Sequence, residues 1–148
     1  MNEQLKLDNQ LCFRLYTASR LLTQAYHPLL SGIGLTYPQY LVMMVLWEKD
    51  AQPVNDIAKR LVLETNTVTP LLKRMEAEGL VVREKQSAAG CDGRQVLVRL
   101  TQKGRDLETE AAQIPYQISG AISCRSLTAD TAPALYATLD DMIATLLG

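Results

Sequence analysis

A cysteine followed by tyrosines at helical intervals carries the clearest reactive chemistry in this sequence. Cys12 falls in the first turn of a predicted helix, where the positive end of the helix dipole favours a thiolate. Tyr16 follows one turn later on the same face. Tyr26 comes 14 residues after Cys12, which is about 21 Å along a helix axis at about 1.5 Å per residue. Within one chain Tyr26 therefore cannot reach the thiol, whereas an antiparallel helix from a second copy would bring it there.

The other two cysteines and the histidine do not indicate a metal site. Cys91 and Cys124 make three cysteines in total, and none of them belongs to a CxxC pair. An odd number without such pairs argues against a disulfide framework and against a zinc site. His27, the only histidine, lies beside Pro28 and is interpreted as a polar residue at a helix end. We therefore expect no metal and no cofactor, which leaves inert buried thiols or redox chemistry.

The charges are unevenly distributed along the chain. Residues 59–105 hold ten Lys and Arg against five Asp and Glu, a net charge of +5, so the rest carries −6 of the overall −1. A basic middle between acidic ends suggests a surface that binds a polyanion. A solvated charged face would give the same pattern.

Size and hydropathy suit one domain in solution. The chain has 148 residues, of which 47% are hydrophobic, enough to bury a core. No apolar run approaches the roughly 18 to 20 residues needed to cross a bilayer, and the N-terminus does not resemble a signal sequence. We expect a cytoplasmic protein with no membrane partner.

Hydrophobic spacing and breaking residues predict a mainly α chain with one β-hairpin. The run at residues 40–47 is apolar nearly all round, which is typical of a buried central helix. Strands at 80–84 and 95–100 flank a loop and should pair as a hairpin. The helices are expected over 8–30, capped by Asp8 or Asn9; from Thr36; from Pro53; from the cluster 64–67 to Gly79; from Thr101, kinked at Pro115; and from Thr128.

Two short helices joined by a tight turn fit a helix-turn-helix, and the hairpin after them would form a wing. Hydroxyl and amide groups on the second helix can contact bases or phosphates in a major groove, and Lys73 and Arg74 can bind phosphate. From spacing alone, ordinary helix capping explains the Thr and Asn residues equally well. The outward residues are expected to be Thr65, Asn66, Thr67, Thr69 and Lys73, and the inward residues Val68, Leu71, Leu72 and Met75.

Several motifs together point to a known family. The wing region contains Leu80-Val81-Val82-Arg83, Asp92-Gly93-Arg94 and Leu100-Thr101-Gln102-Lys103-Gly104. The other motifs are Asn9-Gln10-Leu11-Cys12-Phe13, Gly34-Leu35-Thr36-Tyr37-Pro38-Gln39-Tyr40-Leu41-Val42-Met43, Leu46-Trp47-Glu48, and Thr67-Val68-Thr69-Pro70-Leu71-Leu72-Lys73-Arg74. Over essentially its full length the chain resembles the MarR family of winged helix-turn-helix regulators, and within it the OhrR-type repressors that sense organic hydroperoxides. The resemblance implies one dimeric MarR-like domain, with 1–36 and 105–148 in dimerisation and 37–104 in DNA binding.

The resemblance also implies roles for the thiol and the tyrosines. In OhrR-type repressors the cysteine matching Cys12 senses peroxide, and tyrosines matching Tyr26 and Tyr37 reach it from the other subunit. Phenolic hydroxyls stabilise the thiolate, which attacks the peroxide and becomes a sulfenic acid. We expect Tyr16 to join this group. Some members resolve the sulfenic acid with a second cysteine, and Cys124 lies in the region where that cysteine is found; an inert thiol is the alternative.

For DNA, the resemblance implies a homodimer on a pseudo-palindromic operator, with recognition helices about 34 Å apart. Arg94 at the wing tip is expected to enter the minor groove, with Asp92 holding it extended. The wing loop departs from the family pattern, because Cys91 is unfamiliar there and Gly93 replaces a bulkier residue. The targets are expected to include a gene for organic hydroperoxide detoxification.

Three functions are therefore compared. The first, which we expect, is a redox-sensing repressor that releases its operator when organic hydroperoxides oxidise Cys12. The second is a MarR-type repressor induced by a non-covalent small aromatic ligand. The third is a thiol peroxidase, which is disfavoured because no second cysteine lies near Cys12 in the sequence. We expect a regulator and not an enzyme.

Overall fold

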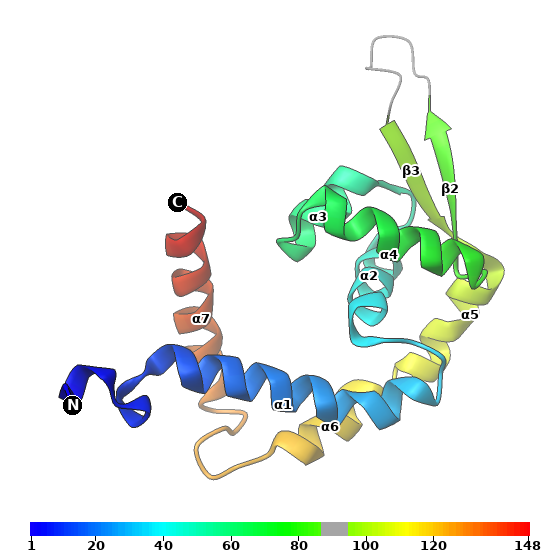
Figure 1. Cartoon of the computed structure of the whole chain (residues 1–148). Helices are drawn as coiled ribbons and strands as arrows, with labels where there is room; N and C mark the ends of the chain where they lie inside the picture. The colour runs from blue at the N-terminus through cyan, green and yellow to red at the C-terminus, as the bar shows by residue number, and fades with distance from the viewer. Residues whose placement is uncertain (87–94) are drawn as a thin grey trace. The chain divides into compact units, whose positions relative to one another are not determined.

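The computed structural model describes residues 1–86 and 95–148, in two units, Met1–Ile114 and Pro115–Gly148 (Figure 1). The sequence predictions for Cys91, Asp92 and Arg94 lie outside the described residues. Helix α6 (Ile114–Ile122) begins at the boundary between the units, and α7 (Ala132–Leu147) lies in the second. The first unit contains η1 (Glu3–Leu5), η2 (Leu7–Asn9), α1 (Leu11–Ser31), α2 (Tyr37–Glu48), β1 (Gln52–Pro53), α3 (Val54–Leu61), α4 (Thr65–Ala77), β2 (Val81–Gln86), β3 (Gln95–Leu100) and α5 (Gln102–Ala111).

Helix α1 begins later than the sequence predicted. Gln10 is its N-cap, not Asp8 or Asn9, because the preceding residues form the short 3₁₀ helices η1 and η2. The Asn9 side chain is used inside that segment, where its Nδ2 donates to the Glu3 carbonyl at 2.7 Å. Cys12 still falls in the first turn of α1, as predicted. The helix then continues without a break to Ser31, through Pro28 in its last turns.

The start of α2 follows the sequence prediction closely. Thr36 is the N-cap, and with Gln39 it forms a capping box in which each side chain bonds the other residue's backbone N–H. Half of the twelve residues of α2 are buried, so it is the central helix expected from its apolar run. The Gln39 amide also donates to the Glu78 carboxylate at 3.0 Å, which ties α2 to the end of α4.

Helices α3 and α4 form the predicted helix-turn-helix. The turn between them contains Val62, whose φ of 57° lies in the left-handed region. Glu64 is the N-cap of α4. The Thr65 hydroxyl donates to the Asn55 side chain at 3.2 Å, and the Thr69 hydroxyl donates to the Thr65 carbonyl at 2.9 Å. The N-cap residue thus comes from the predicted cluster 64–67. Its side chain makes no capping hydrogen bond, and the Thr65 and Thr69 hydroxyls bond other groups.

Strands β2 and β3 form the predicted antiparallel hairpin, with Val81 opposite Leu100 and Gln86 opposite Gln95. The sequence did not predict β1, which pairs with β3 on its other side and gives the order β1-β3-β2. Two residues are too short a run to show strand periodicity. Their pairing places the start of α3 directly against the wing.

The core of the first unit is shared by every element of the helix-turn-helix and the wing. Side chains from α2, α3, α4, β2, β3 and α5 contribute to one hydrophobic cluster. The fully buried members include Val42, Met43, Ile57, Val68, Leu72, Met75 and Val98. As predicted, Val68, Leu72 and Met75 face inward from α4, while Leu71 is half-buried. The shared core holds α4 and the wing as one body.

The C-terminal part differs from prediction at two points. The helix that begins after the Thr101 cap ends at Ala111, and α6 starts afresh at Ile114, so the expected kink at Pro115 is a break between two helices. Thr128 does not begin the last helix, because its backbone and side chain close a turn with Thr131. Helix α7 then starts at Ala132 with a proline in its first turn.

Candidate thiol site and DNA-reading face

Three tyrosines from α1 and α2 form a cluster in the first unit. The ring centroids of Tyr26 and Tyr37 lie 4.9 Å apart, those of Tyr26 and Tyr40 5.9 Å, and those of Tyr37 and Tyr40 6.5 Å. Tyr40 is buried, and the other two are half-buried. The sequence predicted a role for Tyr26 and Tyr37 and did not identify Tyr40. Its position one turn after Tyr37 was the available signal.

Burial raises the pKa values of these phenols, which are protonated at neutral pH in any case. Desolvation raises the pKa of Tyr26, Tyr37 and Tyr40 above 10.0, and in Tyr26 and Tyr40 repulsion from neighbouring tyrosines adds to the rise. A protonated phenol is a hydrogen-bond donor, and a thiolate is an acceptor that such a donor stabilises. At neutral pH the hydroxyls of Tyr26, Tyr37 and Tyr40 can therefore all serve as hydrogen-bond donors.

A hollow of about 220 Å³ lies beside this cluster at the junction of α1 and α2. Tyr37 lines it together with His27, which the sequence had assigned only to a helix end. The polar groups of both side chains and the apolar ones around them suit a small organic molecule. The lining residues are Thr23, His27, Leu30, Leu35, Thr36, Tyr37 and Pro38.

Cys12 lies apart from this cluster in the same chain. It is exposed in the first turn of α1, and Tyr16, one turn on, is 68% exposed. Because α1 is one unbroken helix, the separation of about 21 Å between Cys12 and Tyr26 along its axis holds. Cys124 is exposed between α6 and α7, in the second unit. One chain thus does not join Cys12 to Tyr26 and Tyr37.

The outer face of α4 is polar and accessible. Thr65, Asn66, Thr67 and Lys73 are exposed, as is Arg74, and Thr69 is half-buried. This arrangement agrees with the predicted outward set. A second hollow, of about 140 Å³, lies between this helix, α3 and the wing, and it is lined by Pro53, Val54, Asn55, Thr65, Thr69, Arg83, Gln95 and Val96.

An ion pair fixes the wing to α4. The Arg83 guanidinium lies 3.3 Å from the Glu76 carboxylate, and the same carboxylate accepts the Arg83 backbone N–H at 2.8 Å. Both side chains are partly shielded from solvent. Since Glu76 is on α4 and Arg83 is on β2, the recognition helix and the wing hold a defined relative orientation.

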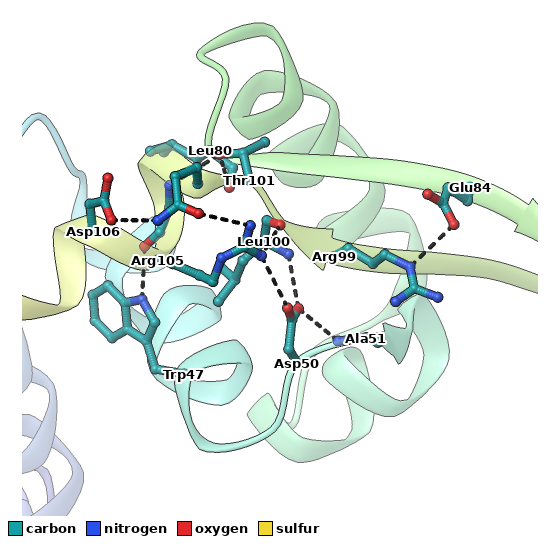
Figure 2. Close-up of polar contacts among 12 residues, drawn as sticks. Trp47, Asp50, Ala51, Leu80, Glu84, Arg99, Leu100, Thr101, Arg105 and Asp106 are labelled. Carbon is teal, nitrogen blue, oxygen red and sulfur yellow. Dashed lines mark hydrogen bonds and ion pairs between the residues drawn. The ribbon is translucent and has the colours of Figure 1, made fainter.

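The base of the wing is fixed by a second set of polar contacts, which we call the wing root: Asp50, Leu100, Gly104 and Arg105 (Figure 2). One oxygen of Asp50 accepts the backbone N–H of Leu100 at 2.9 Å. Arg105 donates to the Leu100 carbonyl at 3.0 Å and lies 3.8 Å from the other oxygen of Asp50. The sequence did not predict this set, which joins residues 50 positions apart.

The described residues contain neither a metal-binding cluster nor a membrane-spanning helix. In residues 1–86 and 95–148, no group of three or more His, Cys, Asp or Glu side chains could hold a metal ion. Among those same residues, no helix combines the length and the apolar character needed to cross a membrane.

Comparison with known proteins identifies the family. A family model described as transcriptional regulator SarA/Rot matches residues 24–110. The chain is 44% identical over 118 residues to the organic hydroperoxide resistance transcriptional regulator of Bacillus subtilis, covering 80% of this chain and 78% of that protein. It is also 37% identical over 124 residues to the regulator MgrA of Staphylococcus aureus, covering 83% and 82% of the two chains.

Solved structures extend the match to nearly the full length. Reduced AbfR bound to DNA is 37% identical, with a TM-score of 0.77 and 99% of both chains covered. Overoxidised AbfR bound to DNA (38% identical, TM-score 0.75) and disulfide-formed AbfR (36%, TM-score 0.63) are also similar, with at least 94% of each chain covered. A MarR-family regulator from Rhodococcus shares the fold at 20% identity, with a TM-score of 0.75 and 93% and 95% of the chains covered. This chain therefore belongs to the MarR family of winged helix-turn-helix transcriptional regulators, in its OhrR-type group.

Proposed function

We propose that this protein is a homodimeric repressor that binds a pseudo-palindromic operator and releases it when organic hydroperoxides oxidise Cys12. One observation carries the proposal: Tyr26 and Tyr37 are in contact, and Tyr26 lies about 21 Å along α1 from the Cys12 thiol of its own chain. In a dimer with antiparallel α1 helices, the cluster of one subunit serves Cys12 of the other. The name of the Bacillus subtilis relative supports organic hydroperoxides as the oxidant.

The chemistry at Cys12 follows from its surroundings. The first turn of α1 and the partner's tyrosine hydroxyls favour the thiolate, and Tyr16 lies one turn away on the same helix. The thiolate sulfur attacks the outer peroxide oxygen and the O–O bond breaks. The organic fragment leaves as an alkoxide and takes up a proton to become an alcohol, and the sulfur is left as a sulfenic acid.

The form that releases DNA is proposed to be a disulfide. A Cys124 thiolate attacks the sulfenic sulfur, an S–S bond forms and the S–O bond breaks. The oxygen leaves as hydroxide and takes up a proton to become water. The solved structures of AbfR support this choice, because reduced and overoxidised AbfR are both bound to DNA, while a separate structure has the disulfide. Both cysteines are exposed in this chain, as the pairing requires.

DNA reading is assigned to α4 and the wing. Asn66 and Thr67, with Thr65 and Thr69 behind them, face the major groove, and Lys73 and Arg74 bind the flanking phosphates. Asp92 and Arg94 are proposed to act at the wing tip in the adjacent minor groove. The +5 charge of residues 59–105 supplies the sequence-independent attraction.

The protein is proposed to be a cytoplasmic regulator and not an enzyme. Its relatives are transcriptional regulators, which supports the regulatory role. Since one thiol reacts once before it must be reduced, we expect one equivalent of peroxide to be consumed per subunit. Repeated consumption with a thiol reductant would identify a peroxidase instead.

The test uses a DNA duplex selected by the reduced protein from a random library. Its dissociation constant is measured before and after one equivalent of cumene hydroperoxide, with the mass of each cysteine peptide determined on the same sample. We expect wild type to bind about tenfold more weakly or worse after oxidation. Cys12→Ser should bind the duplex and show no response. A wild-type protein that is oxidised at Cys12 and keeps its affinity contradicts the proposal.

The hollow beside Tyr37 supports a second candidate, a repressor induced by a non-covalent aromatic ligand. A Cys12→Ser protein that releases the duplex as wild type does, on addition of a phenolic acid such as salicylate, would favour it. In that case oxidation of Cys12 in the wild-type protein should leave the affinity unchanged.

A further inference from the structure

Helix α2 carries two tyrosines of the cluster near its start and Trp47 near its end, next to the wing root. Tyr37 and Tyr40, in the tyrosine cluster, lie in its first turn or so, and Trp47 lies in its last. Tyr40 contacts Trp47 edge to face, with ring centroids 6.4 Å apart and an interplanar angle of 72°. The aromatic contacts thus run without a gap from Tyr26 to Trp47.

Trp47 connects this row of aromatic contacts to α5 through a hydrogen bond. Its indole N–H donates to the Gly104 carbonyl at 3.0 Å, and the two residues are 57 positions apart in sequence (Figure 2). This is a specific contact because the indole offers a single donor, and that donor is used here. A displacement of Trp47 along or across α2 must lengthen this bond or move the start of α5.

Gly104 cannot move alone. A Cβ built on it would collide with the Leu80 carbonyl oxygen, so α5 lies against the backbone at the start of β2. Thr101, the N-cap of α5, donates its hydroxyl to the Gly79 carbonyl at 2.6 Å and to the Leu80 carbonyl at 3.1 Å. The first turn of α5 and the base of the wing therefore shift together.

Asp50 connects the end of α2 to β3, the other strand of the hairpin. One of its oxygens accepts the N–H of Ala51 at 2.7 Å and that of Leu100 at 2.9 Å, at the end of β3 (Figure 2). Ala51 has a φ of 57°, a conformation that costs about 1 kcal/mol or more outside glycine and needs such support. Both wing strands are thus anchored to residues at or just after the C-terminal end of α2.

We propose that Trp47 is the positioning residue through which the tyrosine cluster controls the wing, by way of Tyr40 and the Gly104 carbonyl. The inference rests on the proposed function and adds how oxidation reaches the DNA-reading face. When the partner's Cys12 enters the disulfide and leaves the cluster, Tyr40 shifts against Trp47, and Gly104 moves with the rest of the wing root.

Trp47→Phe tests the link, because phenylalanine keeps the aromatic contact and lacks the donor to Gly104. The measured quantity is the ratio of the duplex dissociation constants after and before oxidation by cumene hydroperoxide. We expect the reduced variant to bind within about threefold of wild type and the ratio to fall about tenfold. Glu48→Gln is the matched control, because Glu48 follows Trp47 on the same turn of α2. The change breaks only the exposed ion pair with Arg60 of α3, so this variant should keep the wild-type ratio.

A wild-type measurement keeps the test decisive even if the variant folds poorly. Trp47 is the only tryptophan, so its fluorescence reports on this position alone. We expect the emission of DNA-free wild type to change in step with oxidation of Cys12, and that of Cys12→Ser to stay constant. Constant emission in oxidised wild type, or an unchanged ratio in Trp47→Phe, overturns the role of Trp47. Failure of wild type to release the duplex overturns the proposed function itself.

Discussion

The tyrosine hydroxyls illustrate how burial sets chemistry at the scale of one residue. Ionising Tyr40 would place a charge in a buried site next to Tyr37 and Tyr26, and this cost raises its pKa. A tyrosine hydroxyl is protonated at neutral pH even without this shift, so the raised pKa extends its range as a donor only toward alkaline pH.

The raised tyrosine pKa values predict a loss of stability in alkali. A group whose pKa is higher in the folded state stabilises fully below its unfolded value, about 10, and the contribution is lost as the pH rises through the folded value. The free energy of unfolding, measured with urea, should therefore fall from about pH 10 upward. Tyr40→Phe removes one titrating group and should flatten this fall. Tyr136→Phe, at an exposed position, should leave the slope unchanged; equal slopes in both variants would contradict the prediction.

Val62 holds an unfavourable backbone conformation in the helix-turn-helix turn. It is a β-branched residue at φ 57°, and its side chain is 53% exposed, so little packing offsets the strain. Val62→Gly should raise the free energy of unfolding by about 1 kcal/mol, measured with urea. Leu63→Gly, at the next position, should lower it, because there glycine adds only chain entropy to the unfolded state. A destabilised Val62→Gly protein would show that the turn is not strained.

At the scale of elements, the first turn of α5 packs closely against the base of the wing. Gly104→Ala forces a methyl group against the Leu80 carbonyl, which is backbone and has little room to yield. We expect a loss of about 2 to 3 kcal/mol in the free energy of unfolding, by urea denaturation. Gly32→Ala, at a helical φ of −62° with only ordinary contacts, should change it by less than about 1 kcal/mol. Similar values for the two variants would show that the wing root is loosely packed.

The element boundaries show what sequence reasoning can and cannot reach. Thr36 and Thr101 were predicted as caps and are caps, because a threonine followed by the right backbone N–H needs only local chain geometry. Asp8, Asn9 and Thr128 offer the same chemistry, but competing local turns place the helix starts later. A local sequence pattern indicates that a residue can cap a helix. It does not indicate whether the helix or a competing turn forms at that residue.

The candidate site divides in the same way. Tyr26 and Tyr37 were predicted as a pair from the resemblance, and the structure brings their rings together. Tyr40, Trp47 and Asp50 were not predicted, because their partners lie on other elements and depend on how α2 packs against α5 and β3. Long-range contacts of this kind have no signature in the spacing of one sequence.

At the scale of the whole molecule, exposed apolar side chains on two helices are candidates for the surface that a second copy would cover. In α1, Leu11, Phe13 and Leu21 are exposed, although Leu30 at its other end is fully buried. Helix α7 likewise exposes Leu135, Ile143, Leu146 and Leu147. Large apolar residues gathered on helices typically mark an interface between proteins. The dimerisation regions expected at 1–36 and 105–148 stay a prediction, and these side chains are the ones that we propose they would bury.

The proposed disulfide concerns the whole molecule, because it joins Cys12 near the N-terminus of one subunit to Cys124 in the C-terminal part of the other. If Cys12 and Cys124 pair between subunits, organic peroxide should convert wild type into covalent dimers on non-reducing electrophoresis. Cys124→Ser should give no such dimers, and its Cys12 should advance to the sulfinic or sulfonic acid, detected by peptide mass. Because we propose that the disulfide is the form that releases DNA, we expect this variant to keep operator affinity under peroxide while wild type loses it by about tenfold or more. Cys91→Ser is the control and should form dimers as wild type does. Covalent dimers in Cys124→Ser, or their loss in Cys91→Ser, would assign the resolving role to another thiol.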